Sequence, residues 1–194
     1  MLKIIAGKYR GKNIETKKSK DIRPTSGKAR GAVFNILSHG IFSGEENSPI
    51  IDKVVADLFC GTGALGLEAI SRGADSVIFV DQSKDSLEIA RKNAMNLKEE
   101  DNCYFVRSDS TSLPKARQVC SLVFLDPPYN SGLATTALKS LDVQGWLAQD
   151  AVAVVELAHK EVFAAPPNYT AFDERKYGNS KVVFLRYVRE NLPV

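Results

Sequence analysis

The feature that most restricts the fold of this chain is a repeated alternation of apolar runs with amphipathic segments. Continuous apolar runs of strand length are typical of strands buried on both faces, with helices between them to cover those faces. The sequence therefore predicts an α/β fold built on a mostly parallel sheet. The expected strands are 53–59, 75–81, 103–109, 121–126 and 151–157, and the expected helices are 63–73, 83–97 and 131–142.

The start of the chain follows a different pattern. Alternating apolar residues around the basic turn at 7–12 predict a hairpin. A helix is expected within 22–38, capped by Thr25 or Ser26, although Gly31 disfavours it. The side chains expected to face the core from this helix are Val33, Phe34, Ile36 and Leu37.

The end of the chain predicts a second hairpin. Residues 169–177 and 180–187 flank a Gly-Asn pair, which is a strong signal for a tight turn between antiparallel strands. Residues 39–51 are rich in helix and strand breakers and predict a linker. We therefore divide the chain into an N-terminal extension, 1–50, and a main domain, 51–194.

Positive charge is concentrated at the start of the chain, although the net charge is only +3. Ten of the 26 lysines and arginines lie within residues 1–30, beside only two acidic residues. A basic segment on a mildly acidic body is typical of a protein that binds a polyanion at one end. A solvated terminus without a ligand is the alternative interpretation.

Membrane and metal-binding functions are not expected from this sequence. No apolar run approaches the roughly 20 residues of a membrane-spanning helix. Cys60, Cys103 and Cys120 have no metal-ligand spacing, and His39 and His159 are isolated. We expect reduced cysteines, a cytoplasmic protein and no bound metal.

A glycine-rich loop follows the first strand of the predicted sheet. Gly61, Gly63 and Gly66 have the spacing GxGxxG between a strand and a helix, and Asp81 lies at the end of the next strand. Glycines allow a ligand to approach the backbone, and an acidic side chain on the next strand accepts hydrogen bonds from ribose hydroxyls. The pattern predicts a nucleotide-like cofactor, and an NAD(P)-dependent oxidoreductase is one class that it fits.

The acidic residues at the strand ends favour a positively charged cofactor. Asp57, just before the loop, is unfavourable beside a pyrophosphate but favourable beside the sulfonium and ammonium groups of S-adenosylmethionine. Asp109 ends the third expected strand and is placed to accept from an adenine amine. An ordinary turn or cap role is the alternative for Asp109.

The stretch from Phe124 to Tyr129, FLDPPY, ends the fourth expected strand. In such sheets ligands bind at the carboxyl ends of the strands. Asp126 and the carbonyl of Pro127 only accept hydrogen bonds, Pro128 stiffens the turn, and Tyr129 offers a ring face. Together they suit a planar heterocycle with an exocyclic amine, whose N–H groups the acceptors bind and whose nitrogen then attacks a methyl group. A rigid turn without a ligand is the alternative.

These motifs resemble those of a known family. The stretches IIAGKYRGKNI, IRPTSGKARGAVFNIL, DLFCGTGALGLEAISRGA, DPPYNSG and GWL are similar to those of the bacterial 16S rRNA (guanine-N2)-methyltransferases of the RsmD type. The resemblance implies a Rossmann-like, seven-stranded methyltransferase sheet with an antiparallel C-terminal hairpin. It also implies methylation of one guanine of 16S rRNA in the small ribosomal subunit or an assembly intermediate, with S-adenosylmethionine as the methyl donor. We expect a monomer.

The resemblance also assigns site residues by position. Those on the RNA side are Lys8, Arg10, Arg23 and Thr25. Those at the target base are Asp126, Pro127, Pro128 and Tyr129. Those at the cofactor are Asp57, Phe59, Gly61, Gly63, Asp81, Gln82, Asp109 and Ser110. The chain departs from the family pattern at Gly27 and Gly31, where the family usually has acidic residues.

Chemical reasoning from the residues leaves the target open. Adenine N6 of DNA or RNA offers the same two N–H groups as guanine N2, and cytosine N4 or a glutamine side chain are further amine targets. A non-enzymatic rRNA-binding assembly factor that keeps a cofactor fold is another class. It predicts rRNA binding without methyl transfer.

Overall fold

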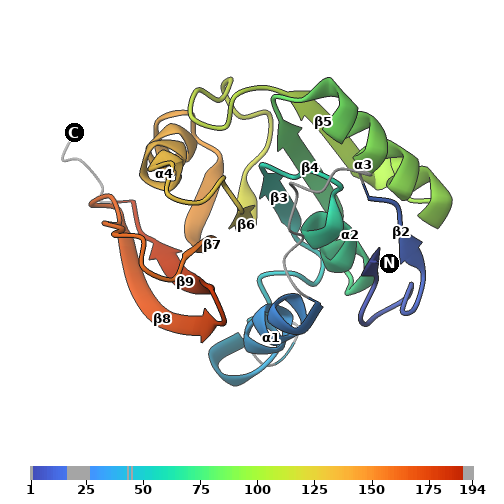
Figure 1. The fold of residues 1–194 in the computed structure, drawn as a ribbon, viewed down its shortest axis with the longest axis horizontal. Helices are drawn as coiled ribbons and strands as arrows, with labels where there is room; N and C mark the ends of the chain where they lie inside the picture. The colour runs from blue at the N-terminus through green and yellow to red at the C-terminus, as the bar shows by residue number, and fades with distance from the viewer. Residues whose placement is uncertain (1, 17–26, 43, 45, 190–194) are drawn as a thin grey trace.

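The computed structural model describes residues 2–16, 27–42, 44 and 46–189 (Figure 1). Within this part, seven strands form one sheet in the order β5-β4-β3-β6-β7-β9-β8, and two short strands form a separate hairpin. The strands are β1 Leu2–Lys3, β2 Asn13–Ile14, β3 Val54–Leu58, β4 Ser76–Asp81, β5 Cys103–Arg107, β6 Cys120–Leu125, β7 Leu147–Ala158, β8 Tyr169–Tyr177 and β9 Ser180–Tyr187. The helices are α1 Gly27–Leu37, α2 Ala64–Ser71, α3 Lys84–Leu97 and α4 Leu133–Val143, with 3-10 turns η1 Gly40–Phe42 and η2 Glu100–Asn102.

The topology confirms the predicted fold class. Strands β3 to β7 pair in parallel, and β9 pairs antiparallel with both β7 and β8. The C-terminal hairpin therefore turns at Gly178-Asn179, as its sequence predicts. β7 begins at Leu147 instead of 151, and β5 ends at Arg107, so Asp109 lies in the loop after the strand.

Each face of the sheet packs against its own hydrophobic cluster. One cluster joins the sheet to α1, α2 and α3 through residues such as Phe34, Leu67 and Leu87. The other joins it to α4 and to loops that hold Leu113 and Trp146. Figure 1 shows α4 on the opposite side of the sheet from α2 and α3. The helical pattern of α3 is confirmed, since Leu87, Ala90, Ala94 and Leu97 are buried and the Ser83 side chain accepts from the Ser86 N–H.

The N-terminal segments pack directly on the main sheet domain. The Glu68 carboxylate, fully buried in α2, accepts from the N–H groups of Ile5 and Ala6 at 2.8 and 3.0 Å. Arg30 of α1 is buried beside it, with Nε 3.7 Å from Glu68, and donates to the carbonyl of Lys3. A Cβ at Gly7 would lie 1.7 Å from the Ser71 carbonyl oxygen, so only glycine fits this contact.

The helix and linker predictions for the extension are partly confirmed. Val33, Phe34 and Leu37 of α1 are buried, while Ile36 is only half-buried. The expected linker includes η1, and its Phe42 and Ile50 belong to the hydrophobic cluster, so this segment contributes to the core. The caps expected at Thr25 and Ser26 lie outside the described residues.

Candidate active site

The predicted cofactor and base residues gather at the carboxyl edge of neighbouring strands. Strand β3 lies between β4 and β6, and Leu58 pairs with both Val80 and Leu125. Consequently three features lie at the same level of the sheet: the glycine loop after β3, Asp81 at the end of β4, and Asp126 after β6. This is the edge at which open parallel sheets bind their ligands.

The glycine loop is fixed by hydrogen bonds to Asp81. The Gly61 N–H donates to one carboxylate oxygen of Asp81 at 2.9 Å, and the Ser83 N–H donates to the other at 2.8 Å. A carboxylate has about four lone-pair sites, so these bonds leave acceptor capacity for a ribose hydroxyl. A Cβ added at Gly61, where φ is 53°, would meet only the Phe59 carbonyl oxygen, at 3.9 Å. The loop backbone is therefore open to a ligand at this position.

Gly63 and Gly66 serve packing between α2 and the sheet. A Cβ at Gly66 would lie 2.4 Å from a ring carbon of Phe79 and 2.7 Å from a methyl carbon of Val77. At Gly63, where φ is 76°, it would lie 3.0 Å from the same ring. These two glycines allow the helix to approach β4, which brings its N-terminus to the loop.

Asp57 is buried in β3 and bound to the helix. Its carboxylate accepts from the Gly66 N–H at 2.9 Å, and the residue is 1% exposed. Burial raises the pKa of Asp57 well above its ordinary value, against the opposing effect of the Gly66 hydrogen bond. The carboxylates of Asp126 and Asp81 raise this pKa further. A cation beside Asp57 would oppose this rise, because an opposite charge favours the ionised form of a carboxyl group.

The remaining expected cofactor residues lie around the same edge in different environments. Phe59 follows β3 with a φ of 57°, an uncommon backbone conformation for an aromatic residue. Gln82 is exposed and Ser110 is buried. The Asp109 carboxylate accepts from the N–H and hydroxyl of Thr111, both at 2.8 Å, and these bonds lower the pKa of Asp109. Asp109 therefore stabilises a turn, which is the alternative role considered for it in the sequence analysis.

The segment from Asp126 to Tyr129 is held by the strand and loop beside it. The Tyr129 hydroxyl donates to Glu156 of β7 at 2.7 Å, and the Asn130 N–H donates to Glu161 at 2.8 Å. Burial and the Glu156 hydrogen bond raise the pKa of Tyr129, so the hydroxyl stays protonated. Pro127 is buried, Pro128 is exposed and Tyr129 is 41% exposed. The Tyr129 side chain is thus partly exposed, while its hydroxyl is held by Glu156.

The sequence also matches a known family. The family model described as Conserved hypothetical protein 95 matches residues 2–186. The chain belongs to this family. An Escherichia coli K12 relative, named Ribosomal RNA small subunit methyltransferase D, is 31% identical over 191 residues, which cover 97% of this chain and 90% of the relative. A Rickettsia prowazekii protein named an uncharacterized methylase is 30% identical and covers 96% of this chain and 98% of its own length.

Solved structures agree with this family membership. The yhhF protein of Escherichia coli matches with a TM-score of 0.81 at 28% identity, covering 97% of this chain and 99% of that one. A Haemophilus influenzae protein matches with a TM-score of 0.77 at 26% identity, over 97% and 99%. The fold is the Rossmann-like methyltransferase fold that the motifs of this family imply.

The family residues expected on the RNA side are only partly described. Lys8 is exposed, but its amine lies 3.0 Å from the Glu99 carboxylate, which the Tyr9 hydroxyl also binds. Arg10 is exposed at the hairpin turn, and Arg23 and Thr25 lie outside the described residues. Asn93 of α3 connects the hairpin to the glycine loop, because its side chain binds both the Glu15 backbone and the Thr62 carbonyl oxygen.

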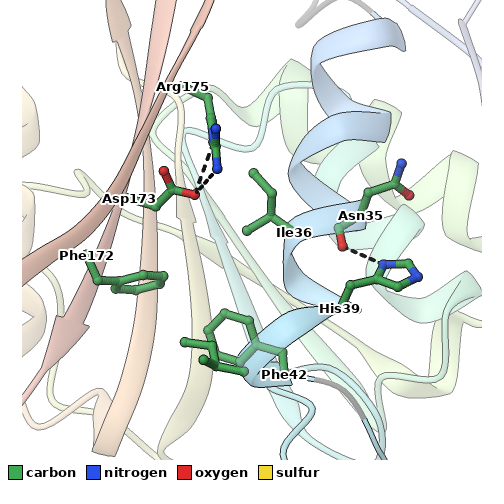
Figure 2. Close-up of a pocket in the computed structure, with 8 residues that line it drawn as sticks. Asn35, Ile36, His39, Phe42, Phe172, Asp173 and Arg175 are labelled. Atoms are coloured by element: carbon green, nitrogen blue, oxygen red, sulfur yellow. Dashed lines mark hydrogen bonds and ion pairs between the residues drawn. The ribbon is translucent and has the colours of Figure 1, made fainter.

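A cavity of about 560 Å³ lies elsewhere, between α1 and β8. Figure 2 shows it with Ile36 and His39 on the helix side and Phe172 and Asp173 on the strand side. None of the expected site residues lines it. Within the described ranges, no group of His, Cys, Asp or Glu side chains is arranged to hold a metal ion. Across the same ranges, every helix is too short or too polar to cross a bilayer.

Sequence reasoning missed the residues that support the site from a distance. Glu156 and Glu161 bind Tyr129 and Asn130, Asn93 joins the hairpin to the glycine loop, and Glu68 binds the start of the chain. A signal existed for Glu156, the one charged residue in the apolar run 151–157. No local pattern marks the others, because their partners lie far away in the chain.

Proposed function

We propose that this protein transfers the methyl group of S-adenosylmethionine to the exocyclic N2 amine of a guanine in 16S rRNA. The observation that carries the proposal is the register of β3 and β6, in which Leu58 pairs with Leu125. The glycine loop and the Asp126–Tyr129 segment therefore start side by side. A donor held by the loop has its methyl group next to a base held by that segment. The relatives named as small subunit rRNA methyltransferases support this activity.

The residues around the loop fit S-adenosylmethionine better than NAD(P). Asp81 and Asp126 bring negative charge to one edge, and the nearby Asp57 would ionise more readily beside a cation. This arrangement attracts sulfonium and ammonium groups and repels a pyrophosphate. When bound, the cofactor supplies an electrophilic methyl group on a positively charged sulfur. We assign to its site Asp57, Phe59, Gly61, Gly63, Asp81, Gln82, Asp109 and Ser110.

The Asp126–Tyr129 segment performs the catalytic positioning. The Asp126 carboxylate and the Pro127 carbonyl accept the two N–H groups of the base amine, and the Tyr129 ring stacks on the base. These hydrogen bonds favour a pyramidal nitrogen whose lone pair points at the methyl group. Asp126 or solvent receives the proton that the amine loses. No covalent enzyme intermediate is required.

The N-terminal extension is proposed to bind the RNA. The extension supplies salt-dependent contacts to phosphates through its exposed basic residues and through Lys8, Arg10, Arg23 and Thr25. The Asp126–Tyr129 segment recognises the base. In this proposal residues 1–50 form the RNA-binding extension and 51–194 the methyltransferase domain. The protein acts as a monomer in the cytoplasm, without a metal, on the small subunit or its assembly intermediate.

The proposal is tested with tritiated S-adenosylmethionine and small ribosomal subunits that lack the modification. The labelled nucleoside is identified after complete digestion of the rRNA. Label in N2-methylguanosine is the expected result, and label in N6-methyladenosine contradicts the choice of base. Binding of rRNA without any incorporated label supports the assembly-factor alternative. Calorimetric titration with NAD(P) tests the oxidoreductase alternative, and we expect no binding.

A further inference from the structure

The apolar strand β7 carries one buried carboxylate beside the candidate base site. Glu156 is 7% exposed, and the residues around it from Ala151 to Leu157 are all buried. Val155 pairs with Leu125, the last residue of β6, so Glu156 lies one step further along β7, level with Asp126 directly after β6. A carboxylate costs free energy when it is buried in an apolar strand, so its position requires an explanation.

The Glu156 side chain lies on the α1 face of the sheet, at the edge where the base is proposed to bind. Its strand neighbours Val152 and Val154 belong to the cluster under α1, and Glu156 pairs with Val182 of the same cluster. The Tyr129 hydroxyl reaches this carboxylate at 2.7 Å. The ring proposed to stack on the base is therefore tied to Glu156, which brings the carboxylate to the border of the base site.

The Watson–Crick edges of the possible target bases differ at the atom beside the amine. In guanine that atom is N1–H, a hydrogen-bond donor. In adenine it is N1 and in cytosine N3, and both are acceptors. A carboxylate only accepts, so it binds guanine there and repels the lone pairs of adenine and cytosine.

We propose that Glu156 selects guanine by accepting a hydrogen bond from its N1–H. This inference rests on the proposed methyl transfer to a base amine and adds a residue that determines which amine is chosen. Asp126 and the Pro127 carbonyl accept from the amine, and Glu156 accepts from the adjacent ring nitrogen. The Tyr129 hydroxyl donates to Oε1 of this carboxylate. Two acceptors directly after β6 and one on β7 then match the three N–H donors of guanine.

The test compares guanine with 2-aminopurine, which keeps the 2-amine but has an acceptor at N1. Small subunits are reconstituted with either base at the methylated position, and kcat/KM for methyl transfer is measured. The wild-type protein is expected to prefer guanine by roughly 10- to 100-fold, because a buried acceptor faces a lone pair in the analogue. Equal kcat/KM for the two bases overturns the role of Glu156.

Two variants separate base recognition from a structural role. Glu156→Gln can accept from Tyr129 and can donate to N1 of 2-aminopurine, so the preference for guanine is expected to fall at least about tenfold. Tyr129→Phe is the control for the hydrogen bond from the Tyr129 hydroxyl, which Glu156→Gln retains. It removes that bond but keeps the Glu156 carboxylate and the ring. It is expected to keep the preference for guanine.

The outcomes also distinguish this inference from the proposed function. Both variants are expected to bind S-adenosylhomocysteine within about twofold of wild type and to unfold at similar temperatures. An unchanged preference in Glu156→Gln, or an equal loss of preference in both variants, overturns the inference. If the wild-type protein labels no guanine N2 at all, the proposed function itself fails.

Discussion

The glycine loop and the Asp126–Tyr129 segment lie at the ends of neighbouring strands but are held in different ways. In the loop, the Asp57 carboxylate accepts from the Gly66 N–H, and the Asp81 carboxylate at the end of β4 accepts from the Gly61 N–H, so both bonds lie within one strand-loop-helix-strand unit. The Asp126–Tyr129 segment and the adjacent Asn130 are instead held by Glu156 and Glu161, about 30 positions later. The proposed cofactor half is thus held within the unit from β3 to β4, whereas the proposed base half is held by Glu156 of β7 and by Glu161 in the loop after it. We expect the two halves to respond differently to mutation.

Asp126→Ala is expected to have the largest effect on activity. It removes an acceptor proposed to stabilise the reacting amine, and loss of one such preorganised group lowers kcat by roughly 100- to 1,000-fold. Single-turnover methyl transfer measures this loss, and calorimetry with S-adenosylhomocysteine measures binding to the other half. Binding within a few-fold of wild type is expected, whereas a matching loss of affinity would show that the halves are not independent.

Gly66→Ala is expected to destabilise the whole cofactor half. The added Cβ would overlap the Phe79 ring and Val77, so helix α2 must move away from β4. Overpacking of this kind costs about 1–3 kcal/mol in the free energy of unfolding. Urea denaturation measures the cost, and an unchanged midpoint would mean that α2 is not packed as described.

Asp57 is expected to make stability depend on pH. Its pKa is higher in the folded chain than in the unfolded chain, so the folded state binds more protons between these two values. The free energy of unfolding therefore falls as pH rises through that interval. Asp57→Asn, which can still accept from Gly66, should flatten this dependence in urea denaturation series. An equally steep decline in the variant would assign the dependence to another group.

The raised pKa of Asp57 also predicts that cofactor binding is coupled to the release of protons. A cation at this edge favours the ionised form of Asp57, so binding of S-adenosylmethionine should release protons. Calorimetry in buffers with different ionisation enthalpies measures the release. The release should be smaller for neutral S-adenosylhomocysteine and smaller again in Asp57→Asn.

Gly31→Ala is expected to have the smallest effect. It should increase the free energy of unfolding, whereas Gly66→Ala should decrease it. Gly31 lies within α1, and an added Cβ would meet Ile5 at an ordinary contact distance of 3.7 Å. Alanine is favoured over glycine inside a helix by about 1 kcal/mol, so the variant should be more stable by that order. Urea denaturation of both glycine variants tests the comparison directly, and destabilisation by Gly31→Ala would contradict the packing of α1.

The sequence predicted the parts of the molecule that depend on local patterns. Strand β3, the glycine loop and the Ser83 cap of α3 follow from short-range periodicity and spacing, and the structure confirms them. The approach of Glu156 to Tyr129 depends on the pairing of β6 with β7, and the burial of Arg30 against Glu68 depends on how α1 packs on α2. Neither pairing is encoded in a local pattern, so both were missed.

The most direct test of the account is a crystal structure with S-adenosylhomocysteine bound. The account predicts that the ligand contacts Gly61 and Asp81, with its sulfur directed toward Asp126 and the Tyr129 ring. A ligand found away from this edge, or with its sulfur pointing away from Tyr129, would contradict the claim that the two strand ends form one methyl-transfer site.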